Sequence, residues 1–265
     1  MSVLRSSWRR SGLEEPSGLT VETAFYGDQL AQLAEQPSSA VTAGSDQTAA
    51  SIPAALIQEY ASGIGVTDAD LEAELLASGV DLSAVAAGVP HERWVIALAG
   101  AIERLSPFQG RFLARCFLRQ AGVYLERRGL QRIVKSLVKS QILKGSPTVV
   151  LAHSLGTVVS YELLTEAAAG EVPLFCTFGS PLGVHIVSNY IGTRSGFPRP
   201  PIARWINALD RRDFVTLGRP LIQSVMGFAG IENVIVDNSG EDKHDVCTYL
   251  ANTDVAREIH HALSQ

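Results

Sequence analysis

Ser154 is the residue whose surroundings are most suited to chemistry. It follows the apolar run TVVLAH and precedes the helical pattern of residues 157–169. A nucleophile on so tight a strand-to-helix turn needs small residues two positions before and two after it, because larger ones would collide with the flanking strand and helix. Ala152 and Gly156 meet this requirement, and no other serine has Ala or Gly at both positions. The pattern predicts a nucleophilic serine.

The same turn predicts a place for negative charge. Ser154 would stand at the N-terminus of the following helix, where free backbone N–H groups and the helix dipole favour an anion. The N–H of Leu155 is therefore expected to donate to an oxyanion formed during attack. The alternative is a buried serine in an ordinary strand–helix turn, and the patterns on both sides of Ser154 favour the nucleophile.

The stretch from Ala152 to Gly156 resembles the nucleophile elbow of the α/β-hydrolase superfamily, in the lipase and esterase form Gly-His-Ser-x-Gly with Ala152 at the first position. The similarity includes the GPI-inositol-deacylase-like lipases. It covers residues 120–265, with a weaker match of residues 25–28 to an early strand end. Lipase-like members usually begin with an apolar strand and a His-Gly turn, and here no histidine precedes His91. The resemblance thus implies an N-terminally abbreviated hydrolase fold.

The resemblance also implies an acid on a loop after a later strand. The segment ARWINALDRRDFV, residues 203–215, is similar to the Trp-x-Asn … Asp-Pro-Val stretch of lipase-like hydrolases, with Phe214 in place of proline. Asp213 matches the family acid, and Asp210 is the alternative. A third interpretation is that both aspartates only offset the two neighbouring arginines in an exposed loop.

A histidine should follow the acid in the same family order. Four histidines come after the serine, and His260 and His261 lie near the end of the terminal helical pattern, where a cation complements the helix dipole. His185 falls in another helical stretch. His244 lies in a polar loop after the last apolar strand, where the family histidine belongs. We expect His244 to be the general base.

These residues together predict ester cleavage through an acyl-enzyme. His244 would remove the proton of Ser154, and Asp213 would hold the imidazole in the required tautomer. The expected substrate is a small-molecule or lipid-like carboxylic ester, although thioesters and amides use the same machinery, and no cofactor is expected.

Three alternatives stay open: a catalytically weak or inactive hydrolase-fold binding module, an acyltransferase that uses the same three residues, and a metal phosphohydrolase built on His244 and Asp245. Suitable spacing of further metal ligands is missing for the last of these.

The elements that must position these residues alternate in the second half of the chain. Helical patterns separate apolar runs at residues 147–152, 174–178, 202–209 and 234–237. Strands separated by helices imply parallel pairing through right-handed crossovers. We therefore expect an α/β-hydrolase fold, with a mostly parallel sheet and helices on both faces. Thr253 is the expected cap of the last helix.

The first half is less regular. Residues 1–20 read as a polar lead-in, and residues 19–26 alternate well enough for a short strand. We expect residues 29–105 to form a helical insertion, which could act as a lid or only pack without contact to substrate, with a helix after Thr67. The expected organisation is one domain over residues 1–265.

Composition excludes other classes of function. The 265 residues carry 22 Lys and Arg against 27 Asp and Glu, a net charge of −5 without basic blocks, which argues against nucleic acid as a partner. The three cysteines form no CxxC pair, so neither a disulfide framework nor a zinc site is expected. The sequence contains no apolar run of about 18 residues, so no membrane span is expected. We expect a cytoplasmic protein, and the sequence leaves room for a homo-oligomer.

Overall fold

The computed structural model describes residues 1–28, 30, 52–77, 100–101, 111–141, 146–166, 171–192 and 202–265. Contacts within the chain divide it into two compact units. The first unit comprises Met1–Tyr26 and Gln131–Gln265, and the second comprises Gly27–Leu130. Residues 29–105, the predicted insertion, lie within the second unit, and many of them lie outside the described ranges.

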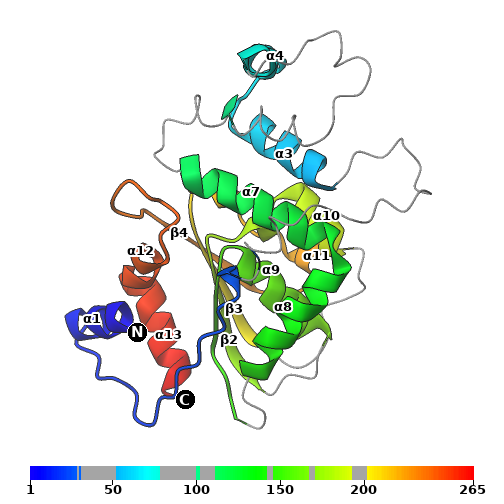
Figure 1. Ribbon diagram of the computed structural model, residues 1–265. Helices are drawn as coiled ribbons and strands as arrows, with labels where there is room; N and C mark the ends of the chain where they lie inside the picture. The colour runs from blue at the N-terminus through cyan, green and yellow to red at the C-terminus, as the bar shows by residue number, and fades with distance from the viewer. Residues whose placement is uncertain are drawn as a thin grey trace. The chain divides into compact units, whose positions relative to one another are not determined.

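A parallel sheet forms the centre of the first unit (Figure 1). Its described strands, in spatial order, are β1 (Val150–His153), β2 (Val172–Phe178), β3 (Ile202–Asp210) and β4 (Ile231–Val236). All three pairings are parallel. The prediction of an α/β protein with a parallel sheet is therefore confirmed. Because parallel strands end at one edge of a sheet, the loops after them converge there.

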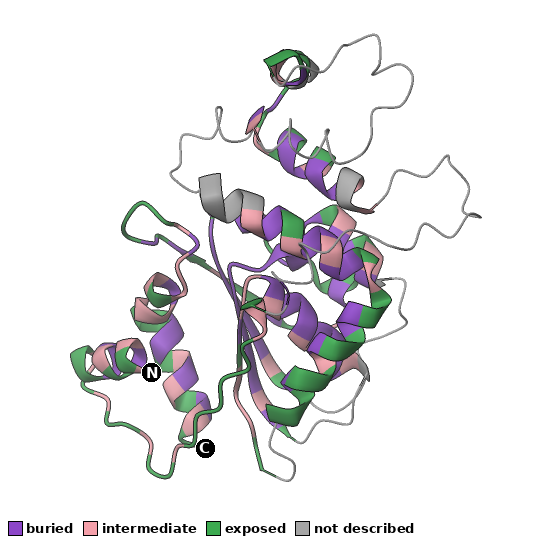
Figure 2. Ribbon diagram, in the orientation of Figure 1, coloured by how far each residue is buried: buried purple, intermediate pink, exposed green. Residues whose placement is uncertain are grey.

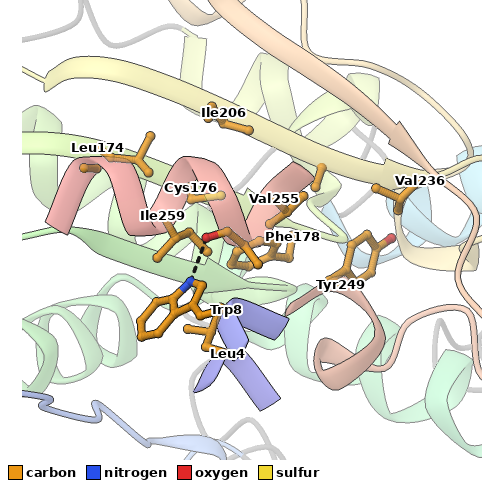
Figure 3. Close-up of a cluster of buried hydrophobic side chains, with 13 residues drawn as sticks. Leu4, Trp8, Leu174, Cys176, Phe178, Ile206, Val236, Tyr249, Val255 and Ile259 are labelled. Carbon is orange, nitrogen blue, oxygen red and sulfur yellow. Dashed lines mark hydrogen bonds between the residues drawn. The ribbon is translucent and has the colours of Figure 1, made fainter. Parts of the chain in front are cut away.

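One face of the sheet is covered by helices from both ends of the chain. These are α1 (Ser2–Arg10), α12 (Val246–Ala251) and α13 (Thr253–Leu263), which lie together in Figure 1. Trp8 and Ile259 pack with Cys176 and other buried side chains of β2 and β3 (Figure 3). The Trp8 indole donates a hydrogen bond to the carbonyl oxygen of Ala256 at 2.8 Å, drawn as the dashed line. The burial of this apolar cluster holds the helices to the sheet.

The opposite face of the sheet carries aromatic side chains. Trp205 of β3 packs against Phe175 of β2, with ring centroids 5.0 Å apart. It also packs against Tyr161 of α9 (Leu155–Glu166), at 5.6 Å. Figure 2 shows β2 and β3 buried along most of their length. Helices thus cover both faces, as expected for buried parallel strands.

Shorter elements follow the ends of β2 and β3. They are η1 (Pro181–Gly183), α10 (His185–Gly192), η2 (Phe214–Thr216) and α11 (Gln223–Met226). The helix α8 (Arg128–Gln141) precedes β1, and Gln131 donates a hydrogen bond to the Tyr190 hydroxyl of α10 at 2.6 Å.

The second unit is helical in its described part. It contains α3 (Ile52–Gly63), α4 (Asp68–Ala77) and α7 (Arg111–Glu126). The rings of Tyr60 and Phe117 pack at 5.7 Å between α3 and α7. Thr67 precedes α4, and its hydroxyl accepts the N–H of Asp70 at 3.3 Å, as the side chain of an N-cap residue does. No helix in the described ranges is long and apolar enough to cross a membrane.

Three local predictions are wrong. Residues 2–10 form α1 rather than a loose lead-in, because this segment buries Leu4 and Trp8 on a surface made by distant residues. Residues 19–26 form no strand and are mostly exposed, so the alternation of apolar and polar residues there does not correspond to a buried face. The last helix is capped by Asn252 rather than Thr253, since the Asn252 side chain accepts two backbone N–H groups.

Candidate active site

Ser154 lies on the predicted strand-to-helix turn. It follows the last residue of β1 and precedes the first residue of α9. Its φ angle is +56°, in the left-handed region that non-glycine residues rarely adopt. The Ser154 N–H donates to the carbonyl oxygen of Phe178 at 3.0 Å, and the Thr157 hydroxyl donates to the carbonyl oxygen of Ser154 at 2.7 Å. These bonds fix a strained turn beside the end of β2.

The surroundings of Ala152 and Gly156 explain why small residues stand at these positions. Ala152 is buried, and a Cβ on Gly156 would lie 3.4 Å from the hydroxyl oxygen of Tyr26. Burial raises the pKa of the Tyr26 hydroxyl.

Leu155 is the first residue of α9, so its N–H has no intrahelical partner and is free for another acceptor.

Asp213 and His244 form a buried pair. His244 Nδ1 donates to Asp213 Oδ2 at 2.8 Å and lies 3.0 Å from Oδ1. Both residues are at most 3% exposed. Asp213 Oδ1 also accepts the N–H of Val215 at 2.9 Å, and Oδ2 accepts the hydroxyl of Tyr249 at 2.7 Å. The carboxylate therefore keeps its hydrogen-bond partners although it is out of water.

The imidazole of His244 lies next to the serine turn. Its ring centroid is 4.4 Å from that of His153, the residue directly before Ser154. No described residue bonds the buried Nε2 of His244, and no hydrogen bond joins it to Ser154. The structure brings Ser154, His244 and Asp213 into one neighbourhood and leaves one imidazole nitrogen unused.

Asp210, the alternative acid, has different partners. Its carboxylate accepts two bonds from the Arg212 guanidinium, at 3.2 and 3.0 Å. It also accepts the N–H groups of Arg212 and Asn238, at 2.8 and 2.7 Å. Burial opposes its ionisation, but these hydrogen bonds outweigh burial, so the pKa of Asp210 lies below its usual value. Asp210 thus fastens the start of the loop that carries His244.

That loop is closed by hydrogen bonds of its own. The Asn238 side chain donates to the carbonyl oxygen of Lys243 at 2.8 Å, and the Lys243 ammonium donates to the carbonyl oxygen of Asn238 at 2.7 Å. The N–H of His244 donates to the Asp242 carboxylate at 2.8 Å. The imidazole is therefore presented from a loop with a defined shape.

Two further residues of the site had no predicted role. The Tyr249 hydroxyl accepts the N–H of Asp210 at 3.0 Å while it donates to Asp213, and burial followed by the charge of Asp213 raises its pKa. Gly179 has φ +53°, and a Cβ there would lie 2.8 Å from Asp213 Oδ2 and from His244 Nδ1 and Cε1. A glycine directly after an apolar strand is the one signal of this close approach in the sequence.

The other titratable residues considered have hydrogen-bond partners outside the pair. His185 is exposed and bonds Asn189, and His260 and His261 lie on α13, where His260 Nε2 donates to the carbonyl oxygen of Glu14. Asp245 caps α12 by accepting the N–H of Cys247. Within the described ranges, no group of three or more His, Cys, Asp or Glu side chains is placed to hold a metal ion.

The site thus combines a serine on a strained turn, a buried imidazole beside it and a carboxylate bound to that imidazole. Ser154 follows β1, Asp213 follows β3 and His244 follows β4, all at the carboxyl edge of the sheet. Comparisons of the chain with protein-family models, with curated proteins and with solved structures gave no match.

Proposed function

We propose that the chain is a serine hydrolase of the α/β-hydrolase type that cleaves a carboxylic ester. Ser154 would be the nucleophile, His244 the general base and Asp213 the acid, with the Leu155 N–H as an oxyanion donor. The observation that carries the proposal is the buried hydrogen bond of 2.8 Å between Asp213 and His244, beside the left-handed turn of Ser154.

The order of the residues along the sheet supports the same assignment. A serine after one strand, an acid after a later strand and a histidine after the last is the order of the α/β-hydrolases. Here these positions follow β1, β3 and β4 of a parallel sheet. The strained turn of Ser154 also matches the conformation of a nucleophile elbow in that fold.

The first half-reaction forms an acyl-enzyme. The Ser154 oxygen bonds to the ester carbonyl carbon while its proton passes to His244 Nε2. The carbonyl oxygen becomes an oxyanion that accepts the Leu155 N–H at the start of α9. When the C–O bond to the alcohol breaks, His244 returns the proton to the leaving alcohol. Asp213 keeps the hydrogen of the imidazole on Nδ1, so that Nε2 can accept.

The second half-reaction releases the acid. Water attacks the acyl carbon while His244 removes its proton, and collapse of the new tetrahedral intermediate returns that proton to Ser154. If an alcohol takes the place of water, the same steps transfer the acyl group. General base catalysis contributes about 10²- to 10⁴-fold to each step.

A serine-directed fluorophosphonate probe tests the proposal. We expect the wild-type chain to be labelled and Ser154→Ala not to be, with Ser160→Ala as a serine control that labels normally. Hydrolysis of p-nitrophenyl esters with increasing acyl length should be lost in the same Ser154→Ala variant, and the preferred length would identify the acyl class.

A folded wild-type chain that neither reacts with the probe nor hydrolyses any ester would contradict the proposal and favour a hydrolase-fold binding module. Acyl transfer that outpaces hydrolysis when an alcohol is added would assign the site to an acyltransferase instead. Labelling that persists in Ser154→Ala would place the nucleophile elsewhere.

A further inference from the structure

His153 makes a hydrogen bond whose direction is fixed by chemistry. It is the last residue of β1, and its Nε2 lies 2.7 Å from the main-chain carbonyl oxygen of His244. A carbonyl oxygen only accepts, so Nε2 of His153 carries the hydrogen and Nδ1 carries none in the neutral ring. The bond joins the strand before the serine to the loop of the histidine, across 91 positions of sequence.

The ring of His153 also lies against the ring of His244. The two centroids are 4.4 Å apart and the planes are inclined by 36°. Asp213 holds the same imidazole at Nδ1, and the backbone of Gly179 lies close to its Nδ1 and Cε1. His244 is therefore constrained by its main chain, one ring face and one nitrogen, while Nε2 has no partner among the described residues.

We propose that His153 is a positioning residue for the His244 imidazole: it anchors the main chain of His244 by its Nε2–H and supports the imidazole ring by contact. This inference rests on the proposed function, because it assigns a role in presenting the base to Ser154. His153 acts through His244 and takes no part in the bonds that form or break.

The charge state of His153 suits this role. Burial, followed by repulsion from His244, lowers the pKa of His153 to about 4. The hydrogen bond to the carbonyl oxygen of His244 acts in the opposite direction, followed by the charges of Asp213 and Asp245, and the ring of Tyr249 lies 6.5 Å away. At neutral pH the ring is therefore uncharged. It keeps its Nε2–H donor and presents an aromatic surface to the imidazolium that forms when His244 accepts a proton, an arrangement that attracts the cation.

Two substitutions separate the hydrogen bond from the ring contact. His153→Gln keeps a nitrogen donor at similar reach and removes the ring, whereas His153→Phe keeps a ring and removes the donor. We expect each to lower kcat for a p-nitrophenyl ester by roughly 10- to 100-fold, because small misplacement of a catalytic group is costly, with KM changed less than about threefold. His261→Gln, on an exposed histidine of α13, should match the wild type.

The pH profile adds a readout that a purely structural role would not change. Loss of the aromatic contact in His153→Gln should move the acid limb of the kcat profile to lower pH by about half a unit. His153→Phe should leave that limb in place, because a ring still faces the imidazolium. Melting temperatures measured in parallel identify a variant that is slow only because it unfolds.

A nuclear magnetic resonance measurement tests the geometry without activity. In ¹⁵N-histidine-labelled protein, the His153 ring should show a hydrogen on Nε2 and stay neutral down to near pH 4. His153→Gln identifies its signals by their loss.

The outcomes separate this inference from the proposed function. Wild-type kcat, KM and pH profiles in both His153 variants would overturn the role of His153 and leave the serine hydrolase intact. Protonation of His153 near its ordinary pKa would also overturn it, because a charged ring would repel the imidazolium. A wild-type chain without labelling or hydrolysis would overturn the proposed function, and the role assigned to His153 with it.

Discussion

Asp213 and Asp210 stand three positions apart and are both buried, yet their partners give them different roles. Asp213 faces the Nδ1 of His244, whereas Asp210 faces Arg212 and the N–H of Asn238. The first carboxylate can set the tautomer of an imidazole, and the second can only hold backbone in place. At the scale of single residues, these partners favour Asp213 over Asp210 as the proposed acid.

Conversion of each aspartate to asparagine tests this difference. We expect Asp213→Asn to lower kcat by about 10³- to 10⁴-fold, since an amide group can stabilise the wrong tautomer and cannot balance an imidazolium. Asp210→Asn should lower the free energy of unfolding by about 1–3 kcal/mol and lower kcat less than tenfold. Steady-state kinetics and urea denaturation measure the two effects. Equal loss of kcat in both variants would contradict the assignment.

The sequence predicted some residues of the site better than others. The turn at Ser154 could be predicted because it imposes local rules on Ala152 and Gly156. The contact of Tyr249 with Asp213 could not be predicted in this way, because it spans 36 positions and the Tyr249 hydroxyl has no local pattern. His153 lies within the motif from Ala152 to Gly156, but its contact with His244 depends on a loop 91 positions away.

At the scale of elements, the loops that follow neighbouring strands approach one another very closely at the carboxyl edge of the sheet. The turn at Gly179, directly after β2, lies against both members of the Asp213–His244 pair. It also donates its N–H to the carbonyl oxygen of Ala208 in β3 at 3.2 Å. This glycine lets three loops converge without a side chain between them.

Gly179→Ala should therefore damage the site more than it damages the fold. The new Cβ would lie 2.8 Å from atoms of Asp213 and His244, so the pair must shift, and we expect kcat to fall by at least about tenfold. Gly230→Ala is the matched control, because Gly230 also has positive φ but an added Cβ meets nothing within 4 Å. Each variant should lose about 1–2 kcal/mol of stability from backbone strain. Equal kcat in both variants, measured with thermal unfolding, would refute the close packing.

Elements with strong periodicity or apolar runs were predicted well, and those defined by distant surfaces were not. The runs before Ser154 and around Trp205 are apolar enough to form strands by local rules, and both are strands. The helix α1 has a polar sequence, and its few apolar side chains are buried only because they pack against α12 and α13. The cap at Asn252 shows that two adjacent polar residues leave a helix start uncertain by one position.

At the scale of the first unit, the two ends of the chain share one hydrophobic cluster. Trp8 is 1% exposed and packs within a cluster that includes side chains of β2, β3 and α13. Its ring also meets the His260 ring at 5.6 Å in an edge-on arrangement. The residues proposed for catalysis lie at the carboxyl edge of the strands, and this cluster packs on one face of the same sheet.

Trp8→Ala should lower the free energy of unfolding by about 3–5 kcal/mol, because it removes a large buried side chain and the donor to Ala256. Val21→Ala, at a side chain that is 50% exposed, should change it by less than about 0.5 kcal/mol. Chemical denaturation gives both values. A change below about 1 kcal/mol in Trp8→Ala would mean that α1 is not part of the folded core.

The bond from Trp8 to Ala256 spans 248 positions of sequence. During synthesis, the first helix leaves the ribosome long before α13, its binding surface, has been translated. Folding during synthesis therefore cannot complete this cluster before α13 has been translated, and the docking of α1 waits for residues made much later.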